Sequence, residues 1–228
     1  FSGMGDSGAR EEYPDEVRLQ ELIDVASKTG LLDNGRKPTI IAHSYGGSVG
    51  LTAMERCHEQ FSRLVICDLM TLRPDRLKAH AKESRPPGSQ EPQRPNRVYP
   101  DYEIAKARFV LSPPQPVNEA YLVDYMAFHS LKAVEGGWSW KFHPSVFDHS
   151  TDLHERLLMQ GKRTANAPGP IVIVYGEQSD LFDADSADYV RECGGGHIPM
   201  IGIPDARHHL MLDQPIAFVS VLRAILTM

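Results

Sequence analysis

Four short runs of apolar residues alternate along the chain with stretches in which apolar residues recur at helical spacing. The runs are rich in β-branched residues and occupy positions 39–42, 64–67, 171–175 and, more weakly, 198–203. An unbroken apolar run of this length is typical of a strand that is buried on both faces. We therefore expect these four segments to be the strands of the core sheet.

Helical patterns lie between and beyond these runs. Apolar residues at 19, 22, 23 and 26 follow an i, i+3, i+4, i+7 spacing, with Pro14 before them as a start signal and Gly30 after them as a stop signal. A second amphipathic pattern follows Pro215, with apolar residues at 218, 221, 222 and 225. Strands that alternate with helices predict an α/β fold with a mostly parallel sheet that helices cover on both sides.

Residues 71–165 interrupt this alternation. The segment is rich in proline, holds both tryptophans and contains helical patterns at 101–110 and 119–131. We interpret it as a mostly helical insertion between two core strands, so that the core comprises residues 1–70 and 166–228. Within the insertion, residues 83–97 approach low complexity and predict a mobile loop.

The composition argues against several classes of protein. The 228 residues are 41% hydrophobic and 24% charged, as in a soluble globular protein, and no run approaches the roughly 18 apolar residues that a membrane span needs. The net charge is -6 and the basic residues are scattered, so we expect no nucleic-acid partner. Three cysteines without C-x-x-C spacing indicate neither a disulfide framework nor a zinc site, and we expect a cytoplasmic location.

Ser44 occupies an unusual place, in the stretch IIAHSYGGSVG at 40–50. A serine between a buried strand and a helix must sit on a very sharp turn, which only small neighbours such as Ala42 and the glycines at 46, 47 and 50 tolerate. Its Oγ would then stand above the sheet, and the backbone N–H of Tyr45 would face a developing oxyanion. A phosphate loop is the alternative, but no lysine follows these glycines and G-x-G-x-x-G is absent. The pattern therefore indicates a nucleophile elbow.

A serine nucleophile needs a base and an orienting acid. Asp180 follows the 171–175 run in YGEQSD, and His208 precedes the last helix in HHLMLDQP. Asp68, which ends the 64–67 run, is the alternative acid, and His209 is the alternative histidine.

Two further carboxylates, Asp183 and Asp185, lie close to Asp180 in the sequence, so they are also candidates for the orienting acid. Any of these aspartates could simply cap a helix. His43 is expected to pack under the elbow, since its side chain should leave the opposite face of the strand from Ser44.

The motifs AHSYGG, YGEQSD and HHLMLDQP, in the order Ser, Asp, His, resemble the α/β-hydrolase superfamily, in particular its cap-bearing carboxylesterase-like members. The resemblance covers essentially the whole chain and implies that residues 71–165 are the helical cap. It also implies that Ser44 is the nucleophile, His208 the general base and Asp180 the carboxylate that fixes the imidazole. His208 should then lie within hydrogen-bond reach of Ser44 Oγ, with Asp180 on its other nitrogen.

The chain departs from the family pattern at two positions. Ala42 replaces the first glycine of G-x-S-x-G, which is a sterically mild change. Arg207 stands where a glycine is expected before the catalytic histidine, and its side chain could crowd the loop.

The resemblance implies hydrolysis of an ester or related acyl substrate through an acyl-enzyme, without a cofactor. Hydrolysis of a carbon–carbon bond by the same triad and a catalytically silent ligand-binding protein remain the alternatives. We expect no metal, because the adjacent His208 and His209 cannot both chelate easily.

The resemblance also implies strands before the glycine-rich opening FSGMGDSG. In the complete fold the 39–42 strand is central, and a loop after one of the earlier strands supplies the second oxyanion donor. We therefore expect a separate segment, on the order of 60 to 80 residues, to complete the sheet.

Overall fold

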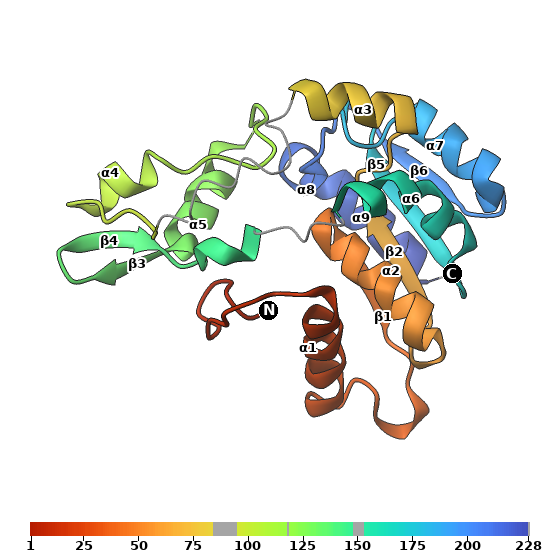
Figure 1. Cartoon of the computed structure of the whole chain (residues 1–228), viewed down its shortest axis with the longest axis horizontal. Helices are drawn as coiled ribbons and strands as arrows, with labels where there is room; N and C mark the ends of the chain where they lie inside the picture. Colours follow the sequence, from red (N-terminus) through yellow and green to blue (C-terminus); the bar gives the residue numbers. More distant parts are fainter. Residues whose placement is uncertain (84–94, 118, 148–152, 228) are drawn as a thin grey trace.

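A computed structural model describes residues 1–83, 95–117, 119–147 and 153–227. Its core is a four-stranded parallel sheet in the order β1-β2-β5-β6, with helices on both sides (Figure 1). The strands are β1 (Thr39–His43), β2 (Arg63–Cys67), β5 (Ile171–Gly176) and β6 (Met200–Ile203). All four predicted strands and the α/β architecture are confirmed.

The two faces of the sheet bury different layers of helices. Leu64 and Ile66 of β2 contribute to one apolar cluster, whereas Val65 and Cys67 contribute to the other. The first cluster packs against α1 (Asp15–Lys28), α2 (Tyr45–Cys57), α6 (Leu153–Asn166) and α7 (Ala184–Val190), and the second packs against α9 (Pro215–Leu226). The alternation of side chains along a strand thus explains why an unbroken apolar run is needed.

Short helical turns connect these elements. They are η1 (Asp33–Gly35), η2 (His58–Gln60), the π turn η4 (Arg191–Gly195) and α8 (Leu210–Asp213).

Helix α2 approaches the sheet closely at one glycine. A Cβ atom on Gly50 would lie 2.6 Å from Cδ1 of Leu64, a side chain with no exposed surface in β2. A larger residue at this position would force either the Leu64 side chain or the helix to move. The glycine-rich sequence after Ser44 therefore holds the start of α2 against the sheet, as predicted.

The inserted segment contains two kinds of structure. Its helical elements are α3 (Pro74–Glu83), α4 (Tyr102–Lys106), α5 (Ala120–Ser130) and η3 (Pro144–Phe147). An antiparallel hairpin of β3 (Leu131–Val134) and β4 (Gly137–Trp140), which the sequence analysis did not foresee, follows α5. The predicted loop at 83–97 lies largely outside the described residues.

Helix α6 falls inside the predicted insertion but packs with the core. Its Ala165 belongs to the same buried cluster as β2 and α7, and Arg156 near its start donates to Ser48 Oγ of α2 at 3.0 Å. Figure 1 shows α4, α5 and the hairpin projecting from one side of the molecule, while α3 and α6 lie over the core.

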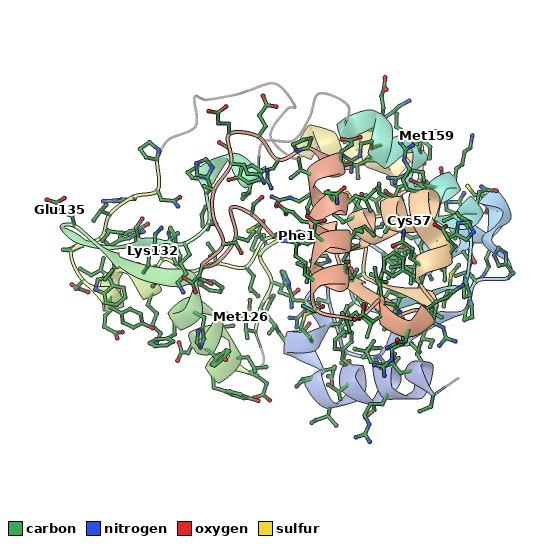
Figure 2. The ribbon with its side chains drawn as sticks, turned by 90° about the horizontal axis from the view of Figure 1, so that it is seen from below. Phe1, Cys57, Met126, Lys132, Glu135 and Met159 are labelled. Carbon is green, nitrogen blue, oxygen red and sulfur yellow. The ribbon has the colours of Figure 1, made fainter. Side chains whose placement is uncertain are left out.

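The N-terminal loop lies between the core and this projecting part. Figure 2 shows Phe1 next to α1, with Met126 and Lys132 to one side and Cys57 to the other. Buried Arg18 of α1 holds the loop, because its Nη1 donates to the Ser2 carbonyl at 2.7 Å and its guanidinium lies over the Tyr13 ring.

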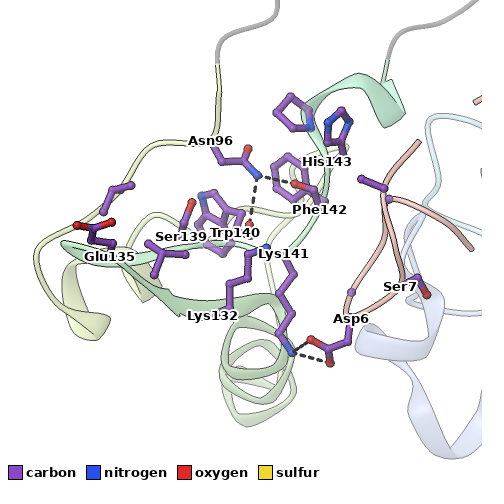
Figure 3. Close-up of a pocket in the computed structure, with 16 residues that line it drawn as sticks. Asp6, Ser7, Asn96, Lys132, Glu135, Ser139, Trp140, Lys141, Phe142 and His143 are labelled. Atoms are coloured by element: carbon purple, nitrogen blue, oxygen red, sulfur yellow. Dashed lines mark hydrogen bonds and ion pairs between the residues drawn. The ribbon is translucent and has the colours of Figure 1, made fainter. Parts of the chain in front are cut away.

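Residues between Ser2 and Tyr13 contact the segment that follows the hairpin. The N–H of His143 donates to the Gly3 carbonyl at 2.7 Å, and Lys141 pairs with Asp6 at 2.9 Å. A cavity of about 550 Å³ opens between the loop and the hairpin (Figure 3). The loop thereby connects α1 with the inserted segment.

Strand β1 forms one edge of the sheet. In the described part of the chain it pairs with β2 alone, and Ile41 on it is 42% exposed. No helix among the described residues combines the length and the apolar character that crossing a bilayer requires.

Candidate active site

Ser44 lies on a strained turn between β1 and α2. Its backbone adopts φ 52° and ψ -123°, a combination that a residue with a side chain rarely takes. The turn is held from both sides, because the Ser44 N–H donates to the Cys67 carbonyl at 2.9 Å and the Ser44 carbonyl accepts from Gly47 at 2.8 Å. A conformation of this kind costs about 1–3 kcal/mol and is found mostly where function requires it.

Tyr45 is the first residue of α2. The N–H groups of a first helical turn have no acceptor within the helix, and the helix dipole places positive charge there. The backbone N–H of Tyr45 is therefore a donor beside Ser44, at the place where the sequence predicted an oxyanion donor.

His208 is buried and pairs with a carboxylate. Its Nδ1 lies 2.9 Å from Oδ1 of Asp68, which follows β2 and has no exposed surface. Asp68 also accepts from the Gly176 N–H at 2.9 Å and from Ser179 Oγ at 2.6 Å. Three hydrogen bonds satisfy the buried carboxylate and fix it toward the imidazole.

The prediction that Asp180 lies on this imidazole is wrong, because Asp68 takes that position. β2 and β5 are neighbouring parallel strands, so the residues that follow them both lie at the carboxyl ends of the strands. Asp68 adopts φ 49° directly after β2, and its side chain points inward. In the loop after β5 it is Ser179 that turns inward to contact Asp68, while Asp180 is exposed.

The sequence analysis missed Ser179, although it stands beside the predicted acid. A hydroxyl next to a candidate carboxylate could have suggested that the loop presents the serine to a buried partner.

The predicted hydrogen bond between Ser44 Oγ and His208 is not formed in this structure. Nε2 of His208 is buried and has no hydrogen-bond partner among the residues that the structure describes. Two cavities, of about 550 and 620 Å³, lie elsewhere, and Ser44 and His208 line neither.

His43 and His209 surround His208. The ring centroids of His43 and His208 are 4.6 Å apart, and those of His43 and His209 are 5.5 Å apart. Nε2 of His43 lies 2.9 Å from the His208 carbonyl, which can only accept, so this nitrogen carries the proton. His43 thus packs under the loop of His208.

Burial sets the charge of these two rings. Desolvation, together with the neighbouring His208 and His209, lowers the pKa of His43 to about 4. Burial and the neighbouring His208 also lower the pKa of His209. His43 is therefore neutral at neutral pH.

Arg207 does not crowd the loop. Its Nη1 donates to the Pro116 carbonyl at 2.7 Å, and its backbone N–H donates to the buried Asp213 at 2.7 Å. His209 is held by the same part of the insertion, because its N–H donates to Gln115 Oε1 at 2.9 Å. The inserted segment thus fixes the loop that carries His208.

The other two candidate carboxylates have structural contacts. Asp183 caps α7 by accepting from Ser186 N–H, and it pairs with Arg76 at 2.9 Å. Asp185 pairs with Arg73 at 2.7 Å. Asp183 thereby joins α3 to α7, and Asp185 joins α7 to the residue just before α3.

Comparisons with known proteins give a consistent result. A family model described as "Alpha/beta hydrolase family" matches residues 1–221, whereas no curated protein matches the sequence. The fold is similar to that of E-2-(acetamidomethylene)succinate hydrolase, with a TM-score of 0.75 at 16% identity over 100% of this chain and 79% of that one. It is also similar to an esterase from Mycobacterium tuberculosis, with a TM-score of 0.71 at 18% identity over 100% and 73% of the two chains.

Proposed function

The chain belongs to the alpha/beta hydrolase family, and from that premise we propose that it is a serine hydrolase that cleaves an ester or related acyl substrate. The observation that carries the proposal is the backbone of Ser44, at φ 52° and ψ -123° on the turn into α2. Strain at this position has no structural benefit of its own, whereas it presents a hydroxyl beside the free N–H groups of a helix.

The surrounding residues supply the remaining roles. Oγ of Ser44 attacks the substrate carbonyl and passes its proton to Nε2 of His208, the nitrogen that has no hydrogen-bond partner in the described part of the chain. Asp68, on Nδ1 at 2.9 Å, fixes the tautomer and stabilises the imidazolium that forms. The Tyr45 N–H donates to the oxyanion.

The proton that His208 has taken then completes acylation, and a second proton transfer completes deacylation. The imidazolium of His208 protonates the leaving alcohol or amine, and an acyl group remains on Ser44. His208 then takes a proton from the water that attacks the acyl-enzyme, and it returns this proton to Ser44 Oγ as the acid leaves. The hydrogen bond between Ser44 and His208 must close for these steps, and such bonds commonly tighten only when substrate binds.

Labelling with a fluorophosphonate probe tests the proposal. The probe should label the chain at Ser44, and Ser44→Ala should abolish labelling. Ser62→Ala is the matched control, because Ser62 is an exposed serine that bonds to Thr39 outside the site, and it should label as the wild type does. A folded chain that binds acyl ligands but is not labelled would instead support a ligand-binding protein.

A substrate panel then addresses the bond that is cleaved. Acyl esters of increasing chain length should be hydrolysed with a dependence on Ser44. Turnover of a meta-cleavage diketone without turnover of any ester would replace the proposed ester chemistry with carbon–carbon bond hydrolysis.

A further inference from the structure

Three imidazoles gather at the centre of the candidate site. One ring nitrogen from each of His43, His208 and His209 lies within 4.8 Å of those from the other two. We propose that these three histidines bind a divalent transition-metal ion such as Zn²⁺, Ni²⁺ or Cu²⁺. Imidazole nitrogens suit these ions, which three nitrogens and one water can hold in a four-coordinate site.

The hydrogen bonds of the three rings leave one nitrogen of each without a proton. The carbonyl of His208 accepts from Nε2 of His43 at 2.9 Å, and the carbonyl of Pro113 accepts from Nε2 of His209 at 3.2 Å. Asp68 accepts from Nδ1 of His208 at 2.9 Å. In a neutral imidazole the nitrogen opposite the donor carries a lone pair.

This arrangement is the one that metal-binding histidines use. A ligating histidine almost always donates its other N–H to a carboxylate or a backbone carbonyl, which fixes the ring and raises the basicity of the ligating nitrogen. All three rings have such an acceptor. The lowered pKa of His43, about 4, and that of His209 also reduce the competition from protons near neutral pH.

The Nε2 atom of His208, which the proposed function uses as the proton acceptor, is also available to a ligand. Its side chain is only 4% exposed, and its Nε2 is buried without a hydrogen-bond partner in the described part of the chain. A buried lone pair without a partner is costly, and a metal ion would satisfy it. His43 and His209 are half-buried, so part of the cluster faces solvent.

Binding requires a small closure of the rings. A tetrahedral ion with metal–nitrogen bonds of about 2.0–2.1 Å holds its nitrogens ~3.3 Å apart. The adjacency of His208 and His209 does not prevent this, because their rings meet edge to face with centroids 4.8 Å apart. The proposal therefore departs from the expectation, drawn from the sequence, that these adjacent histidines cannot both chelate easily.

Metal binding should inhibit the enzyme, a consequence that rests on the proposed function. The ion would occupy the lone pair on Nε2 of His208, which must accept the proton of Ser44. The ion is therefore a reversible inhibitor of this site rather than a cofactor.

Absorption spectroscopy with Co²⁺ as the probe tests the site without relying on activity. Titration of the full chain should produce the intense visible bands of a four-coordinate Co²⁺ ion, and Zn²⁺ should remove them by displacement. His209→Gln should weaken Co²⁺ binding by roughly tenfold or more, because it removes one of three ligands. His43→Gln should do the same and guards against a folding defect in the first variant.

His197→Gln is the matched control, because His197 is an exposed histidine outside the cluster, and its Co²⁺ spectrum should equal that of the wild type. Absence of the bands in the wild type, or equal binding by the wild type and two folded cluster variants, would overturn the proposal.

Inhibition is measured separately from binding. In the wild type, Zn²⁺ should slow fluorophosphonate labelling over the concentration range in which it displaces Co²⁺, and a chelator should restore the rate. If Zn²⁺ binds at the three histidines but labelling is unaffected, the result supports the metal site and contradicts the proposal that His208 is the general base. If the chain is never labelled, the spectra alone still decide whether the metal site exists.

Discussion

At the scale of single residues, two aspartates near the carboxyl ends of β2 and β5 differ in burial. Asp68 is buried and bonds to Nδ1 of His208, whereas Asp180 is exposed. Replacing Asp68 by Asn should reduce kcat/KM by on the order of 10⁴-fold, because an amide cannot hold the same imidazole tautomer. Asp180→Asn is the matched control and should stay close to wild type. Steady-state kinetics on an ester substrate measures both, and a large loss in the control variant alone would restore Asp180 as the acid.

The environment of His43 predicts a dependence of stability on pH. Its pKa is about 4 in the folded chain and about 6.5 in an unfolded chain, mainly because burial disfavours the charged ring next to His208 and His209. Between these values the unfolded chain binds more protons, so the free energy of unfolding should fall as the pH falls. The stability is complete above pH 6.5 and is lost progressively toward pH 4.

His43→Gln isolates this effect. Between pH 6.5 and pH 5 the wild type should lose about 1.6 kcal/mol more stability than the variant does, since one pKa unit corresponds to about 1.4 kcal/mol and the unfolded imidazole is only half protonated at pH 6.5. Urea unfolding at both pH values provides the measurement. Equal losses in the two proteins would show that folding does not lower the pKa of His43.

At the scale of elements, Gly176 brings the end of β5 close to the loop of His208. A Cβ atom at this position would lie 2.3 Å from the Ala206 carbonyl oxygen and 2.5 Å from that of Arg207. These are backbone atoms, so Gly176→Ala must move the loop that carries His208. We expect a loss of about 1–3 kcal/mol in the free energy of unfolding and slower fluorophosphonate labelling of the folded protein.

Gly196→Ala is the control for this change. A Cβ atom there meets no described atom within 4 Å, so both stability and labelling should remain near wild type. If Gly176→Ala matched this control, the close packing of β5 against the histidine loop would have no part in holding His208.

The same elements show what the sequence could and could not predict. The four strands and α1, α2 and α9 follow from apolar runs, helical spacing and their start and stop signals, which are local. Assigning the acid depends on which of two neighbouring strand ends turns inward, and the left-handed backbone of Asp68 decides this. The hairpin was missed, although its two-residue turn, Glu135-Gly136, contains a glycine with positive φ and is a local hairpin signal.

At the scale of the whole molecule, the sheet has an apolar edge. In the part of the chain that the structure describes, β1 pairs with β2 alone, and Ile41 on that strand is 42% exposed. The unpaired N–H and C=O groups of such an edge can pair with a strand from another chain. We therefore expect the chain to associate as its concentration rises, which sedimentation velocity can measure.

A charged residue on β1 distinguishes pairing of this edge strand from nonspecific association through exposed apolar surface. Lysine is a residue that natural proteins place on edge strands, because a charged side chain must be desolvated when another strand docks beside it. Ile41→Lys should therefore keep the chain monomeric at concentrations where the wild type associates. Val25→Lys is the matched control, because Val25 is 60% exposed but lies on a helix, α1, and not on a strand, and this variant should associate as the wild type does. Equal suppression by both variants would place the association on the exposed apolar surface in general, and no effect of Ile41→Lys would mean that β1 is not the docking edge.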